Sequence, residues 1–276
     1  SVEYIGLEAF EYCIGLKTVV IPETIKNVGS AIFFGCEGLE KAEIFAKLTD
    51  LKGMFNWCDN LKSIKYPDTI EKIESFDNCE LEKITIGDDV TSVGLFGNCK
   101  NLKFVYIGEK TELLRASGVF SNCPNLTTLV VSENNPYYKA VNNCLYTKDG
   151  KIILSAAGGI SGTFKGEQGV ETISDECFEN CTKLEKIILP DSVVNIKSRA
   201  FSNCDKLEKI ITGPNISKIE TDIVDDTLYK RSSENWKDGV LYIDEYAVQA
   251  EDIWGECRLK EGTKLIADNA FKAYRK

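Results

Sequence analysis

The eleven cysteines are the side chains best suited to covalent or metal chemistry in this chain of 276 residues, and no histidine accompanies them. The absence of histidine excludes Ser–His–Asp and Cys–His catalysis, histidine general bases and the commonest zinc sites. Cys177 and Cys181 could form half of a zinc site, but no second pair of cysteines stands at ligand spacing. What the other thiols do depends on the elements that position them.

Eight of the cysteines recur along the chain in steps of 20 to 24 residues, with one interruption after the sixth. Each has a phenylalanine three residues before it and a leucine two or three residues after it. The eight are Cys13, Cys36, Cys58, Cys79, Cys99, Cys123, Cys181 and Cys204. This recurrence predicts a repeated structural unit of about the same length.

The segment after each leucine follows an L-x-x-V-x-I pattern, as in residues 16–21 and 184–189, and its apolar residues at alternate positions predict a strand with one buried face. Proline or glycine follows and ends the strand, as at Pro22 and Gly87. So short a unit cannot bury its apolar side alone, whereas stacked copies can. We therefore predict an α/β repeat solenoid, a leucine-rich-repeat right-handed coil with a parallel sheet on its concave face, two hairpin insertions and little regular helix.

Charge gives an independent indication of the register. The first variable residue of successive strands alternates in sign, reading Lys17, Glu40, Lys62, Glu82 and Lys103. Stacked strands of a parallel sheet would bring these side chains side by side, where opposite charges stabilise the pairing.

Two segments interrupt the repeat. In the first, apolar runs flank Asp149-Gly150, which predicts a hairpin. The second, from Lys237 to Val248, repeats the Leu-Tyr pair of the first and contains a predicted tight turn. We expect one domain over residues 1–276, with repeats at 1–131 and 170–224 and insertions at about 132–169 and 232–258. Insertions of this kind either contribute to a binding face or merely widen the sheet.

Stacking also bears on the thiols. Cysteines on adjacent coils would have parallel Cβ vectors about 4.8 Å apart, too far for an unstrained disulfide. We therefore expect reduced, buried thiols in the repeat. Cys144 and Cys257 fall outside this slot, and the sequence leaves open whether either forms a disulfide.

Other motifs carry little chemistry. Asp88-Asp89 and the acidic residues at 222–226 lack the spacing of a calcium loop. Gly158-Gly159 lacks the lysine of a phosphate-binding loop and is interpreted as a flexible turn. We predict no catalytic residues, no cofactor and no metal.

The run Ala9-Phe10-x-x-Cys13-x-x-Leu16 and the repeated Asn-Cys pair, as at Asn203-Cys204, resemble the BspA-like leucine-rich repeat family over nearly the whole chain. The resemblance implies a bacterial, or sometimes protozoan, surface or secreted protein, frequent in gut and oral anaerobes. It also implies a non-catalytic module for binding and adhesion.

The exposed face of the predicted sheet supplies candidate binding residues. Phe104 and Tyr106 share one face of a strand, and Val130 borders them on the next. Tyr137 and Tyr138 open the first insertion. Exposed aromatic groups favour partner binding, but the insertion could instead fold over them and bury them.

The remaining expectations concern partners and location. A net charge of −10 argues against nucleic acid, and no apolar run is long enough for membrane insertion. We expect an extracellular or cell-surface fragment without its signal peptide or anchor. Its partner would be a host extracellular-matrix protein or another bacterial surface protein. The alternative is a carbohydrate-binding module or a structural spacer in a larger exported protein.

Overall fold

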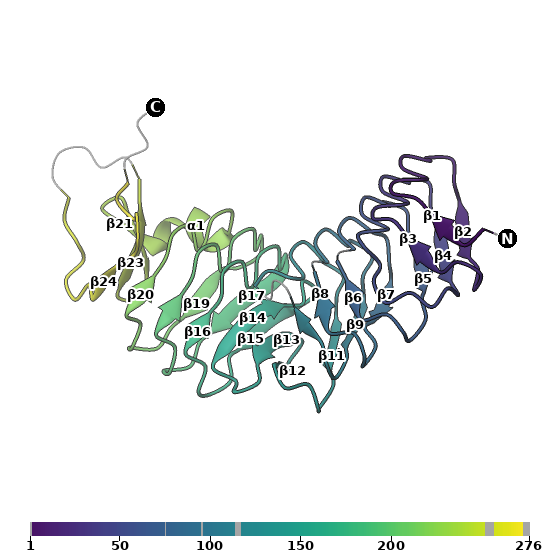
Figure 1. Cartoon of the computed structure of the whole chain (residues 1–276). Helices are drawn as coiled ribbons and strands as arrows, with labels where there is room; N and C mark the ends of the chain where they lie inside the picture. Colours follow the sequence, from purple (N-terminus) through teal and green to yellow (C-terminus); the bar gives the residue numbers. More distant parts are fainter. Residues whose placement is uncertain (1, 75, 95, 114–116, 252–256, 273–276) are drawn as a thin grey trace.

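The chain winds as a parallel β-solenoid of about 11 turns, which Figure 1 shows as an arc. The computed structural model describes residues 2–74, 76–94, 96–113, 117–251 and 257–272. Within them, regular helix is limited to α1 (Leu228–Arg231) and the short 3-10 turn η1 (Ser233–Asn235). The predicted repeat solenoid is confirmed.

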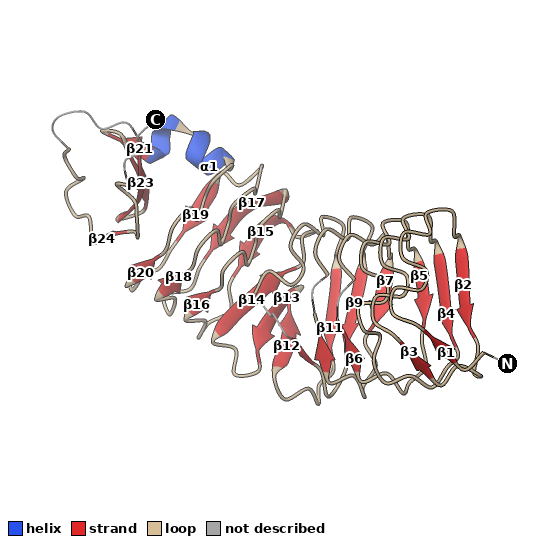
Figure 2. Ribbon diagram, turned by 45° about the horizontal axis from the view of Figure 1, so that its top comes forward, coloured by secondary structure: helices blue, strands red, loops and turns tan. Residues whose placement is uncertain are grey.

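One side of the solenoid carries strands of three to six residues, and we call it the long-strand face (Figure 2). Its strands are β2 (Thr18–Ile21), β4 (Lys41–Ile44), β5 (Ser63–Lys65), β7 (Lys83–Thr85), β9 (Phe104–Ile107), β11 (Thr128–Val131), β15 (Ser161–Lys165), β17 (Lys183–Ile188) and β19 (Lys209–Ile211). They form three parallel sheets, β2-β4-β5, β7-β9-β11 and β15-β17-β19. Equivalent residues lie side by side, as Val19 does with Ala42 and Ile84 with Val105.

The other side of each coil carries a strand of only two residues. These strands are β1 (Tyr4–Ile5), β3 (Asn27–Val28), β6 (Lys72–Ile73), β8 (Ser92–Val93), β10 (Glu112–Leu113), β16 (Thr172–Ile173), β18 (Asn195–Ile196) and β20 (Lys218–Ile219). Their second residue points into the core, because strand side chains alternate between faces. The Phe-x-x-Cys turns and the Pro or Gly turns join the two sides.

The phenylalanines form ladders through the core. Seven of them are at most 1% exposed, and these are Phe33, Phe55, Phe76, Phe96, Phe120, Phe178 and Phe201. Rings on adjacent coils stack, with centroids 5.9 Å apart between Phe96 and Phe120. In the second half Phe164 of β15 packs on Phe178 at 4.7 Å and starts a second ladder.

The cysteine slot has a polar role that the sequence did not reveal. The Cys99 thiol donates a hydrogen bond to the Phe76 carbonyl of the preceding coil at 3.1 Å. The same bond joins Cys36, Cys58, Cys79, Cys123 and Cys204 to the preceding phenylalanine carbonyl. A buried carbonyl without a partner costs free energy. Cysteine therefore combines a small apolar volume with the one donor this position needs.

The residue before each ladder cysteine adopts the left-handed backbone conformation, which explains the Asn-Cys pair. Asn98 has φ 60° and Asn203 has φ 58°, and Gly35 has φ 67° at the same position. Glycine and asparagine tolerate this region better than other residues do.

The first insertion forms the antiparallel strands β12 (Tyr138–Val141), β13 (Cys144–Thr147) and β14 (Ile152–Ala156). The predicted Asp-Gly turn joins β13 and β14, and Asn142-Asn143 makes a second, tighter turn before β13. Gly158 and Gly159 follow β14. A Cβ on either would lie within 2.6 Å of a carbonyl oxygen of the preceding coil, so close packing explains them better than a flexible turn does.

The first insertion separates two cores. Leu145 and Leu154 belong to the N-terminal core, whereas Cys144 and Ile153 belong to the C-terminal core. Successive side chains of these strands therefore face opposite halves of the solenoid. The apolar interior is thus not one unbroken column, because a sheet buried on both faces divides it.

The second insertion follows α1. It comprises β21 (Trp236–Lys237), β22 (Val240–Ile243) and β23 (Tyr246–Ala250), with β24 (Leu265–Ile266) returning in parallel beside β23. The Tyr229 hydroxyl donates to the Tyr242 carbonyl at 2.8 Å and joins this sheet to α1. Residues 252–256 of the expected insertion lie outside the described residues.

We expect Phe96→Ala to lower the free energy of unfolding by about 3–5 kcal/mol, because it leaves a cavity between two stacked rings. Phe10→Ala is the matched control, because Phe10 fills the same slot but is 42% exposed. Its loss should be clearly smaller in urea denaturation followed by circular dichroism. Equal losses would contradict a buried ladder.

We expect a thiol reagent at pH 8 to label Cys13 and Cys257, the two exposed thiols of the eleven, and to reach the others only after denaturation. Burial raises the pKa of Cys58 and of Cys204 to about 12, so these thiols stay protonated and unreactive at pH 8. Counting labelled thiols by mass spectrometry in native and denaturing buffer tests this. Rapid native labelling of Cys58 would contradict it.

Candidate binding surface

A ladder of charged side chains runs along the start of the long-strand face. Glu40 forms ion pairs with Lys17 at 3.5 Å and with Lys62 at 3.3 Å, and Lys103 pairs with Glu82 at 3.3 Å. The hydrogen bonds from these lysines lower the pKa of Glu40. The predicted stacking of charges is confirmed for these pairs. Lys62 and Glu82 lie on either side of a break in the sheet.

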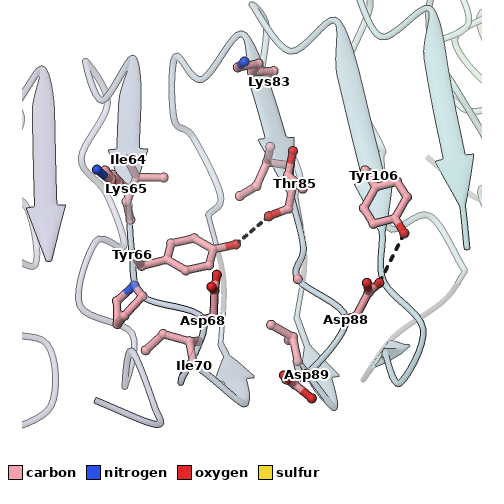
Figure 3. A pocket seen from close by; sticks show the side chains of 14 residues that line it. Ile64, Lys65, Tyr66, Asp68, Ile70, Lys83, Thr85, Asp88, Asp89 and Tyr106 are labelled. Atoms are coloured by element: carbon pink, nitrogen blue, oxygen red, sulfur yellow. Dashed lines mark hydrogen bonds between the residues drawn. The ribbon is translucent and has the colours of Figure 1, made fainter. Parts of the chain in front are cut away.

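This break separates β5 from β7. In the described residues β5 pairs only with β4, and β7 pairs only with β9. On the opposite side of the same coil, β6 continues to pair with β8 and bridges to Asp50. The solenoid is therefore continuous on one side and open on the other. Figure 3 shows β5 and β7 set farther apart than β7 and β9.

The opening is a cleft of about 590 Å³. Ile64 and Ile84 line it from the two strands, and Ile70 and Val90 line it from the turns that follow. The Tyr66 side chain crosses the cleft and donates a hydrogen bond to the Thr85 carbonyl at 2.8 Å (Figure 3). Burial between the two coils raises the pKa of the Tyr66 phenol further above neutrality.

Charged groups of opposite sign line the two ends of the cleft. Lys83 stands at the start of β7 (Figure 3), whereas Lys65 ends β5 and places its ammonium 5.5 Å from the centre of the Phe45 ring. Asp68, Asp88 and Asp89 stand in the turns where the strands end (Figure 3). Lys83 is thus the positive group toward the strand starts, and the three aspartates are the negative groups toward the strand ends.

One of the predicted binding residues lines this cleft, and two others lie next to it in the sheet. Tyr106 lines it, and its hydroxyl donates to Asp88 Oδ1 at 3.2 Å. Val130 pairs in register with Tyr106, and Phe104 lies two residues earlier on β9. Phe104 and Tyr106 are half-buried and Val130 is 38% exposed, so the first insertion does not cover them. We call Phe104, Tyr106 and Val130 the aromatic patch.

The two tyrosines of the insertion behave differently from each other. Tyr137 is 43% exposed, whereas Tyr138 is 8% exposed and packs on the N-terminal core. The Tyr138 oxygen accepts a hydrogen bond from the Leu113 amide at 3.3 Å. Tyr138 is therefore a core residue and cannot offer its ring to a partner.

Sequence reasoning missed Tyr66 and the cleft. The one signal was a shortened turn, because Cys79 and Leu81 are two residues apart where the other repeats have three. Asp88, first considered for calcium, holds the Tyr106 hydroxyl and the Glu109 amide, and Asp89 pairs with Lys110 at 2.6 Å. The described residues hold no cluster suited to a metal ion and no helix able to cross a membrane.

The chain matches the family model described as the BspA type leucine rich repeat region, in 6 copies over residues 1–103, 52–148 and 164–276. A search of the curated proteins found no match.

Solved structures share the fold. A leucine rich cell surface protein from Faecalibacterium prausnitzii is 26% identical with a TM-score of 0.58, over 79% of this chain and 66% of that chain. The pneumococcal vaccine antigen PcpA is 18% identical with a TM-score of 0.55, over 80% and 58%. A leucine-rich repeat protein from Eubacterium ventriosum is 18% identical with a TM-score of 0.59, over 92% and 82%.

The chain spans 66% of the length of the F. prausnitzii protein and 58% of the length of PcpA. The similarity to PcpA and to the E. ventriosum protein shows a shared fold alone. The family model accounts for nearly every coil described above. The chain belongs to the BspA-type leucine-rich repeat family.

Proposed function

We propose that this chain is a non-catalytic protein-binding module of a bacterial surface or secreted protein, and that it binds its partner through the long-strand face. The aromatic patch carries the proposal, because it places two half-exposed rings on the long-strand face, and one of them, Tyr106, lines the cleft. Aromatic side chains that bury against a partner supply much of the binding energy of protein interfaces.

The surroundings of the patch favour a protein over a carbohydrate. Ion-paired lysines and glutamates border the rings, which resembles the polar rim of a protein interface. A carbohydrate site would favour rings spaced along the face for stacking on successive sugars, whereas Phe104 and Tyr106 lie together on β9. A carbohydrate-binding module or a structural spacer is therefore the second candidate.

The whole chain would present this face as one unit. The sheet of the first insertion packs on both cores, so the two halves share a buried boundary. This supports a single domain over residues 1–276. The surface location is supported by the name of the F. prausnitzii neighbour, a leucine rich cell surface protein. With it we propose an adhesive role, with a host matrix protein or another bacterial surface protein as partner.

We expect the double variant Phe104→Ser and Tyr106→Ser to weaken partner binding at least about tenfold without unfolding the solenoid, because loss of two central aromatic contacts removes binding energy. Binding to purified extracellular-matrix proteins is measured by biolayer interferometry, and thermal unfolding is measured on the same samples. A glycan array is probed in parallel.

Trp57→Asn is the matched control. Trp57 is 56% exposed on a Phe-x-x-Cys turn, and its φ of 62° is one that asparagine adopts at the equivalent positions. This variant should bind like the original chain. Binding to glycans but to no matrix protein, or equal loss in both variants, would argue against the proposed function.

A further inference from the structure

In the described part of the chain the long-strand face has two breaks, and main-chain atoms of an insertion fill only one of them. Between β11 and β15, residues of the first insertion fill the junction, where the Gly159 amide donates to the Leu126 carbonyl at 2.9 Å. The Asn143 side chain also accepts from the Leu129 amide at 3.3 Å. Between β5 and β7 the hydrogen bond from Tyr66 spans the cleft instead.

Main-chain groups face this cleft from both sides. In neighbouring coils the second variable residue donates back to the preceding coil, as Ser63 N does to Glu40 O at 3.3 Å and Thr128 N to Lys103 O at 3.1 Å. The equivalent donor and acceptor here are Lys83 N and Lys62 O, on strands that do not pair. The cleft therefore has two strand edges, one on β5 and one on β7.

The Thr85 carbonyl, on the edge of β7, needs a hydrogen-bond donor from the cleft. In a parallel pair it would accept a strand amide from the preceding coil. The hydroxyl of Tyr66 occupies that place at 2.8 Å. The Tyr66 side chain can rotate out of the cleft, whereas a paired strand could not leave it without unfolding its coil.

We propose that the cleft between β5 and β7 binds an extended peptide segment of a partner protein, which adds a strand between the two edges. This inference rests on the proposed function and assigns the chemistry of the partner. Peptides that add a strand to a sheet gain affinity from main-chain hydrogen bonds and specificity from alternate side chains. Here both edges of the incoming strand would find partners.

Charge complementarity links the direction of the peptide to its sequence. A strand parallel to β5 and β7 would have its N-terminal end beside Lys83 and its C-terminal end beside Asp68 and Asp88. Charge complementarity then requires acidic residues first and basic residues last. Apolar side chains at alternate positions would face Ile64 and Ile84.

The test uses two fluorescein-labelled peptides of alternating threonine and valine. One carries two glutamates at its N-terminal end and two lysines at its C-terminal end, and the other carries these ends exchanged. We expect the first to bind the full chain at least about tenfold more tightly in fluorescence anisotropy. N-methylation of alternate amides in this peptide should abolish binding, because it removes the main-chain donors.

Variants of the chain test the cleft itself. The double variant Lys83→Glu and Asp68→Lys should reverse the preference between the two peptides. Lys209→Glu, at the equivalent position of the paired strand β19, is the matched control and should leave both affinities unchanged. Tyr66→Phe should bind the first peptide about two- to tenfold more tightly, because no hydroxyl bond to Thr85 need be broken.

Equal binding of both peptides, binding that survives N-methylation, or a preference that the double charge variant does not reverse would overturn the inference. Concentration-dependent self-association blocked by the double charge variant would identify a second copy as the occupant, and binding of sugars that Tyr66→Phe weakens would identify a carbohydrate. Either result would also overturn it. Partner binding that depends on the aromatic patch but not on Lys83 or Asp68 would overturn strand addition and leave the proposed function intact.

Discussion

The structure depends on the in-register stacking of successive coils. A single coil leaves its apolar slots open, so each must place phenylalanine, cysteine and leucine directly over the same residues of its neighbour. The thiol bond to the preceding phenylalanine carbonyl is part of the same constraint, because it joins one coil to the next through a buried donor. The left-handed residue before each cysteine turns the chain so that this bond can form.

A molecule built in this way is uniform wherever stacking is complete, and its chemistry concentrates where stacking is interrupted. The cleft between β5 and β7 is such a place, because a paired sheet has no room for a partner and an unpaired one exposes donors and acceptors. The aromatic patch lies on the next strand, so apolar contact, charge and main-chain hydrogen bonds are available within one region of the face.

The first insertion shows a second way of interrupting a solenoid. Its strands bury both faces, one against each core, so it continues the apolar contact between the halves while it breaks the long-strand sheet. The same packing buries Tyr138 in the N-terminal core and leaves Tyr137 partly exposed to solvent. The insertion therefore holds the two halves together and leaves the aromatic patch uncovered.

The repeat, the strands, the buried slots and the pairs of stacked charges were all determined by the sequence alone, because period and polarity are local properties that recur and reinforce one another. The candidate patch at Phe104, Tyr106 and Val130 could be predicted for the same reason. The cleft, the crossing hydroxyl of Tyr66 and the burial of Tyr138 were decided only by the tertiary structure. Each depends on how two neighbouring segments come to lie against each other in space. A shortened turn such as that between Cys79 and Leu81 indicates an irregular coil, but it does not indicate on which side the coil opens.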